Sequence, residues 1–327
     1  MGWVRRGMRP LSVLALVGVL AWRVEPAAVA HAWRQVDPPT LGLALAAAVA
    51  VAGVSTVCVA WRWVLIARGL GLALTLPDAV AASYRAQFLN VTLPAGVAGD
   101  VHRAVTHGRS AGDVARGTYA VVGERAAGQA VQVALALAAL AIVPSPLHHW
   151  TAGPPMGPPG QVGWGVGLAA AVVVGLGVRA RLRRKRSGVD AGPGGARSGL
   201  RRVLLSPRVW PAVVLMSVVA VAGHVGTFLL AARAAGVAAV PLQLVPLAFV
   251  VLLAAAVPVN LAGWGPREGA AAWAFGASGL GADRGVVVAA VYGALVVVAS
   301  LPGAAVILHA RRRDRVQAPA STGRAHA

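Results

Sequence analysis

Long apolar runs alternate with short polar interruptions along most of this chain. Leu41–Trp61, Val209–Ala232 and Gly285–Leu308 contain no charged residue, and a helix needs about 20 apolar residues to cross a bilayer. Further apolar runs, which are shorter or contain a charged pair, lie at Leu11–Trp22, Thr118–Val143, Gln161–Val178, Leu242–Val257 and Pro266–Ala282. The pattern predicts an all-α, polytopic helical membrane protein with about eight transmembrane helices and broken or re-entrant segments.

Two glycine- and proline-rich breaks interrupt apolar sequence in the two halves of the chain. Pro94-x-x-Val97-Ala98-Gly99 in the first half parallels Pro258-x-x-Leu261-Ala262-Gly263 in the second. Paired helix breaks of this kind indicate a transport site near the middle of the bilayer. Four matching positions also leave chance similarity open. The predicted break residues are Pro94, Gly96, Gly99, Pro258, Gly263 and Gly265.

The apolar runs and their breaks also predict how the chain is arranged across the membrane. Pro77–Arg116 is predicted to form two half-helices that re-enter from the cytoplasmic side, since irregular backbone at membrane depth must be covered by protein or water. Leu242–Ala282 fits either two crossings or a re-entrant hairpin, and both versions place both termini in the cytoplasm. The proline-rich segment Pro144–Gly160 is expected outside. Residues 1–30 fit a short first helix, although Ala28-Val29-Ala30 also resembles a signal-peptide cleavage site.

The location of the charge indicates what the basic composition means. Hydrophobic residues make up 57% of the chain and charged residues 12%, while the net charge is +20. Ten basic residues and one acid fall in the connection 179–208, where they follow the positive-inside rule and face anionic lipid. No basic surface interleaved with aromatics points to nucleic acid. We expect a transmembrane domain over 1–310 and a disordered basic tail over 311–327.

Asp100, Arg103 and His107 are spaced to share one helix face directly after the first break. One interpretation is structural, with Asp100 as a helix cap and an intrahelical ion pair. The other places Arg103 and the amides of the helix start against an anionic group. Gln87 and Asn90 share a face that leads into the same break, where they could form hydrogen bonds within the helix bundle or line a headgroup site.

Two adjacent charge pairs lie in the remaining apolar segments. Glu124 and Arg125 point about 100° apart on a helix, so each needs a partner from another helix. The pair could serve structural pairing within the bundle or a headgroup contact. Glu268 suits the first turn of a helix that begins at Pro266, whereas Arg267 opposes the helix dipole there. An anionic ligand or a buried acid would resolve that conflict. Arg62, between two tryptophans, is predicted to be an interfacial anchor.

Several classes of chemistry lack their residues in this chain. No two of the ten acids lie within ten positions of each other, and there is no nucleophile elbow, phosphate-binding P-loop or metal-type histidine spacing. Cys58 is the single cysteine, so disulfides and cysteine-based metal sites are excluded. We therefore predict no enzymatic activity, no metal and no cofactor.

Together these motifs resemble the lysylphosphatidylglycerol synthase transmembrane-region family, which consists of flippase-like membrane proteins. The resemblance covers nearly the whole chain and rests on the following residues: Arg62-Trp63, Gln87-Phe88-x-Asn90, Pro94-x-Gly96-x-x-Gly99-Asp100-x-x-Arg103, Glu124-Arg125 (usually Asp-Arg) and Pro258…Gly263-x-Gly265-x-Arg267-Glu268-Gly269. It implies a multi-helix fold with re-entrant segments that moves lipids or lipid-linked sugars between leaflets. Some relatives carry an aminoacyl-transferase domain, for which this chain leaves no room after Ala310.

The predicted function is translocation of an anionic phospholipid or polyprenyl-linked glycolipid in the cell membrane. The alternative is a membrane enzyme or accessory scaffold in lipid-phosphate or envelope-glycolipid synthesis. The predicted partners are membrane lipids and envelope-biosynthesis enzymes. The predicted headgroup-binding residues are Arg103, Arg125, Arg267, Asp100, Glu124, Glu268, Gln87 and Asn90.

Overall fold

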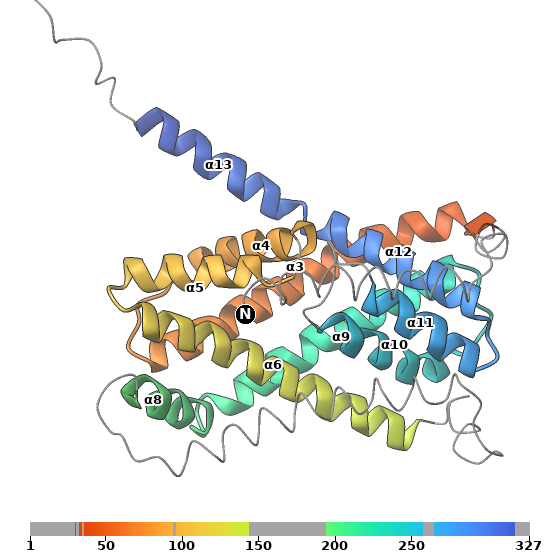
Figure 1. Cartoon of the computed structure of the whole chain (residues 1–327), viewed down its shortest axis with the longest axis horizontal. Helices are drawn as coiled ribbons and strands as arrows, with labels where there is room; N and C mark the ends of the chain where they lie inside the picture. Colours follow the sequence, from red (N-terminus) through yellow and green to blue (C-terminus); the bar gives the residue numbers. More distant parts are fainter. Residues whose placement is uncertain are drawn as a thin grey trace, which may run out of the picture.

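The structure is a computed structural model that describes residues 30, 33–34, 36–93, 96–143, 194–257 and 265–317. Over these residues the regular structure is entirely helical (Figure 1). The helices are α3 (Pro38–Gly69), α4 (Leu76–Thr92), α5 (Ala98–Ser110), α6 (Val114–Ile142), α8 (Gly194–Leu204), α9 (Trp210–Ala234), α10 (Pro241–Ala255), α11 (Pro266–Ala277), α12 (Ala282–Ser300) and α13 (Pro302–Gln317).

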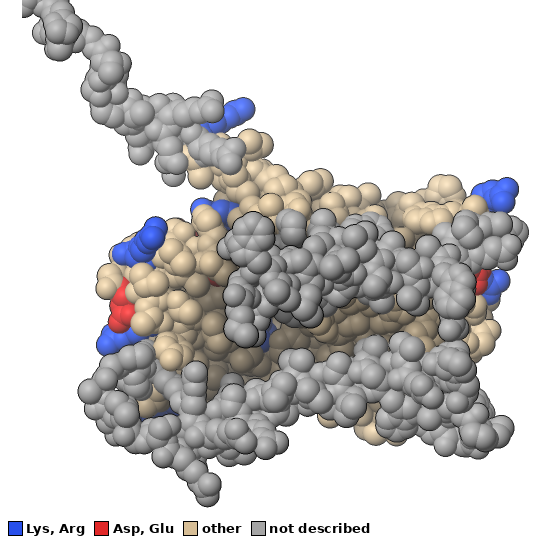
Figure 2. Space-filling model, viewed as in Figure 1, with Lys and Arg blue, Asp and Glu red and all other residues tan. Residues whose placement is uncertain are grey.

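Four stretches of helix within the described residues are long and apolar enough to cross a bilayer: α3, α6, α9 and the continuous stretch Ala282–Ala310. With 32 residues, α3 is about 48 Å long, which exceeds a hydrocarbon core of about 30 Å. Its outer surface exposes Leu43, Val49, Val54 and Val57, side chains that suit lipid contact. On the face seen in Figure 2, most charged side chains lie toward the two ends of the bundle. The chain is therefore a polytopic helical membrane protein, as predicted.

Two short helix pairs enter the bundle from opposite ends. In Figure 1, α4 and α5 form a hairpin that starts where α3 ends, whereas α10 and α11 form a hairpin that starts where α9 ends. These two ends are opposite because α3 and α9 are antiparallel: the amide of Asp37, before α3, donates to the carbonyl of Ala234, the last residue of α9, at 3.0 Å.

The second hairpin distinguishes the two topologies that the sequence leaves open for Leu242–Ala282. With 15 residues, α10 spans about 22 Å, which is too short to cross the hydrocarbon core. Its end at Ala255 lies beside residues from the middle of α9 and α12 around a shared cavity. The short arms described for this segment favour a re-entrant hairpin over two crossings. Residues 11–22, 144–160 and 161–178, which carry other parts of the predicted topology, lie outside the described residues.

The described helices form two halves of equivalent order and opposite orientation. In the first half, the span α3 is followed by the hairpin α4–α5 and the span α6; in the second, the span α9 is followed by the hairpin α10–α11 and the span α12. Each half has its own apolar core, one centred on the end of α3 with α4 to α6 and the other on α9 to α12. This arrangement has the form of an inverted-topology repeat, which places the two hairpin tips at the interface between the halves.

Two peripheral helices include residues of the two basic segments of the chain. The last part of the basic connection 179–208 contains α8, whose Leu200 and Val203 pack onto Gly123 of α6 and Gly69 of α3. At the other end of the chain, α13 extends away from the bundle (Figure 1) and ends at Gln317. Residues 311–317 are therefore helical rather than disordered, because they continue the helix that begins at Pro302.

Candidate functional site

A cavity of about 1050 Å³ lies between the two halves and is lined by both hairpins. The first hairpin contributes Gly96 and Val97 beside its break, and the second contributes Ala256 and Val257. Spans α3, α6, α9 and α12 complete the wall. The described ends of both breaks thus border one cavity. Of the predicted break residues, Pro94, Pro258 and Gly263 lie outside the described residues.

Glu124 is fully buried and forms the centre of a cluster behind the cavity wall. Its carboxylate pairs with Arg62 of α3 and with Arg103 of α5, and Nη1 of Arg62 donates to Oγ of Ser217 on α9 at 2.7 Å. Arg103 also lies over the ring of Trp63, 4.9 Å from its centroid. The prediction that Glu124 finds its partners on other helices is confirmed.

Arg62 is the clearest correction among the candidate residues. It was predicted to be an interfacial anchor, but its side chain is only 6% exposed and its Nε donates to Glu124 at 3.0 Å. Gly128 of α6 makes room for it, because a Cβ there would lie 2.7 Å from Nη2 of Arg62. The flanking tryptophans suggested interfacial depth, whereas the acid that determines the position of Arg62 lies on another helix.

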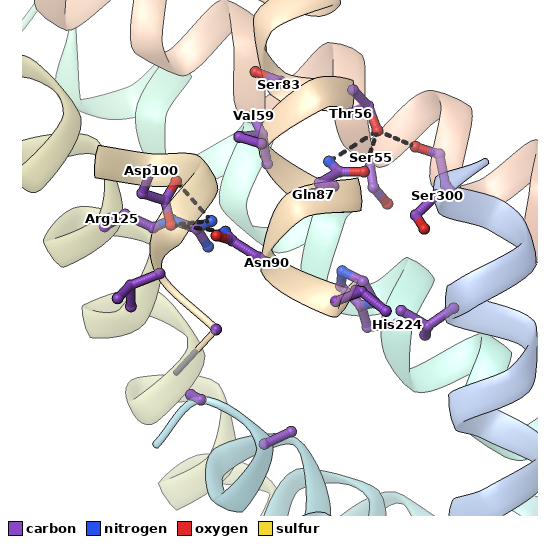
Figure 3. Close-up of a pocket in the computed structure, with 18 of the residues that line it drawn as sticks. Ser55, Thr56, Val59, Ser83, Gln87, Asn90, Asp100, Arg125, His224 and Ser300 are labelled. Carbon is purple, nitrogen blue, oxygen red and sulfur yellow. Dashed lines mark hydrogen bonds and ion pairs between the residues drawn. The ribbon is translucent and has the colours of Figure 1, made fainter. Parts of the chain in front are cut away.

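Asp100 joins the first hairpin to α6 at the cavity surface (Figure 3). Its carboxylate lies 2.7 Å from Nη2 of Arg125 and 3.1 Å from Nε of Arg103, and it accepts a hydrogen bond from Asn90 Nδ2 at 3.0 Å. The prediction that Asp100 caps α5 is wrong, because the helix begins at Ala98 after Val97, which makes no side-chain cap.

Asn90 and Gly99 close the described part of the first break. The Gly99 amide donates to Asn90 Oδ1 at 2.7 Å, so the carboxamide of Asn90 binds α5 through both of its ends. A Cβ on Gly99 would overlap the backbone of Ala86 on α4, so the close approach of the two arms requires glycine.

The second hairpin holds a smaller ion pair beside its break. Gly265 precedes α11 with φ of 122°, and its amide donates to Glu268 Oε2 at 2.7 Å. The other oxygen of Glu268 lies 2.9 Å from Nε of Arg267. The predicted capping role of Glu268 is confirmed, and the unfavourable position of Arg267 is balanced by this neighbouring acid.

The two buried hairpin arginines, Arg103 and Arg267, occupy equivalent places. Each follows the glycine that ends the shared sequence skeleton by four residues, each lines the cavity, and each lies against an aromatic ring. The ring beside Arg267 belongs to Tyr292 of α12, whose centroid is 5.9 Å away. Tyr292 and its hydrogen-bond partner His224, 3.2 Å away, were not predicted as site residues, since single polar residues in apolar spans give a weak signal.

Arg125 differs from the other site arginines by its exposure. Its side chain is 46% exposed, compared with 2% for Arg103 and 9% for Arg267, and it lines the cavity. Three arginines, Arg62, Arg103 and Arg125, face two carboxylates, Asp100 and Glu124. The cluster therefore carries one net positive charge, which is most accessible at Arg125.

The eight predicted headgroup residues thus separate into two groups. Gln87, Asn90, Asp100, Arg103, Arg125 and Arg267 line the cavity, whereas Glu124 and Glu268 lie behind it as counter-charges. The predicted use of free helix-start amides is weakened, because the Gly99 and Gly265 amides already donate to Asn90 and Glu268. Within the described residues, no group of three or more potential metal ligands is present.

Fold and site together define a polytopic membrane protein with two opposed helical hairpins around a positively charged cavity. The family model of the lysylphosphatidylglycerol synthase transmembrane region matches residues 10–303. The chain belongs to this family, as its motifs predicted. Searches of curated proteins and of solved structures give no significant match.

Proposed function

We propose that this chain is a flippase-like lipid translocator that moves an anionic phospholipid or a polyprenyl-linked glycolipid between the leaflets of the cell membrane. The observation that carries the proposal is the cavity between the two hairpins, at whose surface Arg125 presents the net positive charge of the cluster. A cationic group held inside a membrane protein is costly and is retained at ion and substrate pathways. Membership of the family supports the same conclusion.

In the proposed mechanism, a lipid phosphate enters the cavity and binds Arg125, while the acyl or prenyl chains stay in the bilayer. Arginine suits this task because its planar guanidinium can bind two phosphate oxygens and stays charged when partly buried. Arg103 and Glu124 hold the first hairpin in place behind the contact, and Arg267 approaches from the second hairpin. Movement of one half against the other then passes the headgroup across.

The inverted arrangement of the two halves supports this mechanism, because each hairpin blocks the cavity from one end of the bundle. Both termini are placed in the cytoplasm in this proposal, with the basic α8 at the inner surface, where anionic lipid attracts arginine. The chain acts without enzymatic chemistry, on membrane lipids and beside envelope-biosynthesis enzymes.

The test is reconstitution of the full chain into liposomes that contain an acyl-labelled fluorescent phosphatidylglycerol. Dithionite quenches only the outer leaflet, so translocation raises the quenched fraction above about one half. Ala256→Trp should block movement by filling the cavity, because this residue is exposed at the tip of the second hairpin. Ala138→Trp, at an exposed position of α6 away from the cavity lining, is the matched control. Equal quenching with and without protein would rule out translocation of phosphatidylglycerol, and the same result with a labelled polyprenyl-linked glycolipid would overturn the proposal.

A further inference from the structure

We infer that the cavity selects a lipid whose phosphate carries an uncharged, hydroxyl-rich group, such as glycerol or a sugar, over a lipid that carries an amine. This inference rests on the proposed function and specifies the substrate of the same site. Two properties of the cavity wall support the inference: the ion pairing of its carboxylate, Asp100, and the positions of its neutral polar side chains.

The carboxylate of the cavity is already neutralised. Asp100 is the only acid among the described residues that line the cavity, and Arg103, Arg125 and Asn90 all bind it. An ammonium group would need a carboxylate as its counter-charge, yet the wall presents a net positive charge instead. Burying an amine there would add like-charge repulsion to the cost of desolvation.

The wall opposite the charged cluster is lined mainly by neutral polar groups, and its charged residue is Arg267, which lies against Tyr292. Figure 3 shows Asp100 and Arg125 on one side of the cavity and Thr56, Gln87, Ser300 and His224 on the other. These four residues come from α3, α4, α12 and α9, and hydroxyl, amide and imidazole groups can each donate or accept hydrogen bonds. Such groups match the hydroxyls of a polyol, which donate and accept in the same way.

Several of these groups are held in place by hydrogen bonds within the wall. Gln87 Nε2 donates to Thr56 Oγ1 at 3.0 Å, Thr56 Oγ1 donates to the Ala52 carbonyl at 2.7 Å, and Ser300 Oγ donates to the Val297 carbonyl at 2.7 Å. Thr56 is 0% exposed and Ser300 is 3% exposed, so these two hydroxyls hold the wall in place, whereas the Gln87 carboxamide is partly exposed to the cavity. His224 is exposed and has one ring nitrogen, Nδ1, paired with Tyr292, which leaves Nε2 for a ligand.

The size of the cavity agrees with a headgroup larger than bare phosphate. Drug-sized ligands occupy pockets of about 300–1,000 Å³, and this cavity has about 1050 Å³. A phosphate bound at Arg125 would leave most of that space beside the neutral wall. An attached glycerol or sugar would fill part of it.

The experiment compares four acyl-labelled lipids in the same dithionite assay with the full chain. They are phosphatidylglycerol, phosphatidic acid, phosphatidylethanolamine and lysyl-phosphatidylglycerol, so that polyol, bare phosphate, amine and aminoacyl headgroups are separated. We expect phosphatidylglycerol to move at least about tenfold faster than either amine lipid, because the positively charged wall disfavours an amine. A tenfold difference in rate corresponds to about 1.4 kcal/mol. We expect phosphatidic acid to lie between them.

The outcomes separate this inference from the proposed function. If either amine lipid moves as fast as phosphatidylglycerol, the inferred selectivity is wrong while translocation stands. If none of the four lipids moves, translocation of phospholipids, the first form of the proposed function, fails.

Two variants test the neutral wall directly. Gln87→Leu and His224→Phe should each slow phosphatidylglycerol about threefold or more while leaving phosphatidic acid nearly unchanged, because only the polyol uses these groups. Ser278→Ala, which removes a hydroxyl bonded to the Ala274 carbonyl away from the cavity, should change neither rate. Equal slowing of both lipids would indicate a structural effect and would overturn the assignment of that residue.

Discussion

Nη2 of Arg125 lies 2.7 Å from the carboxylate of Asp100, and this ion pair connects α6 to the second arm of the first hairpin at the cavity surface. The two residues differ in exposure, with 46% of the Arg125 side chain and 15% of the Asp100 side chain accessible. Because Asp100 also pairs with Arg103, it stays neutralised when Arg125 turns toward a ligand. Arg125 can therefore exchange a carboxylate for a phosphate without leaving a buried acid unpaired.

Arg125→Gln should reduce anionic-lipid translocation at least about tenfold with little loss of thermal stability. The reason is that Asp100 keeps Arg103 and Asn90 as partners when Arg125 is replaced, so no acid is left unpaired, whereas the proposed headgroup contact needs the charge. Arg125→Lys should recover part of the rate, because lysine keeps the charge and loses the two-pronged contact. The dithionite assay and a thermal melt in detergent measure the two effects.

The matched control for Arg125 is Arg116→Gln. Arg116 pairs with Asp113 at 3.2 Å and is 50% exposed, also on α6 but outside the cavity lining. The Arg116→Gln substitution should leave translocation unchanged. A wild-type rate in Arg125→Gln would remove this arginine from the proposed mechanism.

Glu124→Gln should destabilise the protein far more than Arg125→Gln. Glu124 is fully buried and balances Arg62 and Arg103, so its neutralisation leaves buried cations uncompensated. Removal of one member of a buried ion pair costs about 3–5 kcal/mol. A thermal melt should show a clear loss of Tm for Glu124→Gln, and Glu124→Asp should retain part of the stability. Equal melting temperatures for Glu124→Gln and Arg125→Gln would contradict a structural role for this carboxylate.

The sequence predicts the helices of this fold better than the contacts between them. Apolar length is a local property, so the long spans were predictable, and the paired skeletons around Gly99 and Gly263 indicated both breaks. The depth of Leu242–Ala282 depends on how α10 and α11 pack in the bundle, and a short apolar run fits two topologies. Partners were harder still: Glu124 required a cation on another helix, but nothing local showed that Arg62 was that cation.

Gly293→Ala should lower both stability and translocation. A Cβ at Gly293 of α12 would overlap the guanidinium of Arg267, so the arginine or the helix must shift. Because the guanidinium is the far end of a flexible side chain beside the cavity, its displacement should cost less stability than the about 1–3 kcal/mol of overpacking a filled core. The thermal melt and the dithionite assay should therefore both change.

The control for Gly293 is Gly226→Ala on α9, where a Cβ meets no atom within 4 Å. This substitution should be neutral or stabilising by up to about 1 kcal/mol, because alanine favours helix more than glycine. If Gly293→Ala behaves like Gly226→Ala, the close packing of Arg267 onto α12 does not constrain the site.

Cysteine labelling in a Cys58→Ser background should place the two hairpin bases on opposite sides of the membrane. Ala111→Cys lies between α5 and α6, and Ser278→Cys lies between α11 and α12. An impermeant maleimide added to intact cells should label Ser278→Cys and should reach Ala111→Cys only after lysis, since the basic α8 lies at the same end as the first hairpin base. Labelling of both positions from the same side would overturn the opposed-hairpin arrangement.

The two hairpin tips should be close enough to be joined by a short chemical bridge. Val97→Cys and Val257→Cys, again without Cys58, place one thiol beside each break, and both native residues line the cavity and are exposed. A reducible bifunctional thiol reagent should link them within one chain, as a mobility shift on a denaturing gel would show. Because the link ties the two halves together across the cavity, it should also stop translocation, and reductant should restore it.

The control pair for this crosslink is Val97→Cys with Ser278→Cys, which places the second thiol at the far end of α11. That pair should stay unlinked under the same conditions, since the 12 residues of α11 alone span about 18 Å. Crosslinking of Val97→Cys with Val257→Cys without loss of translocation would show that the hairpin tips are neighbours whose separation plays no part in transport. Absence of any link in the folded protein would mean that the two breaks do not share one cavity in the membrane.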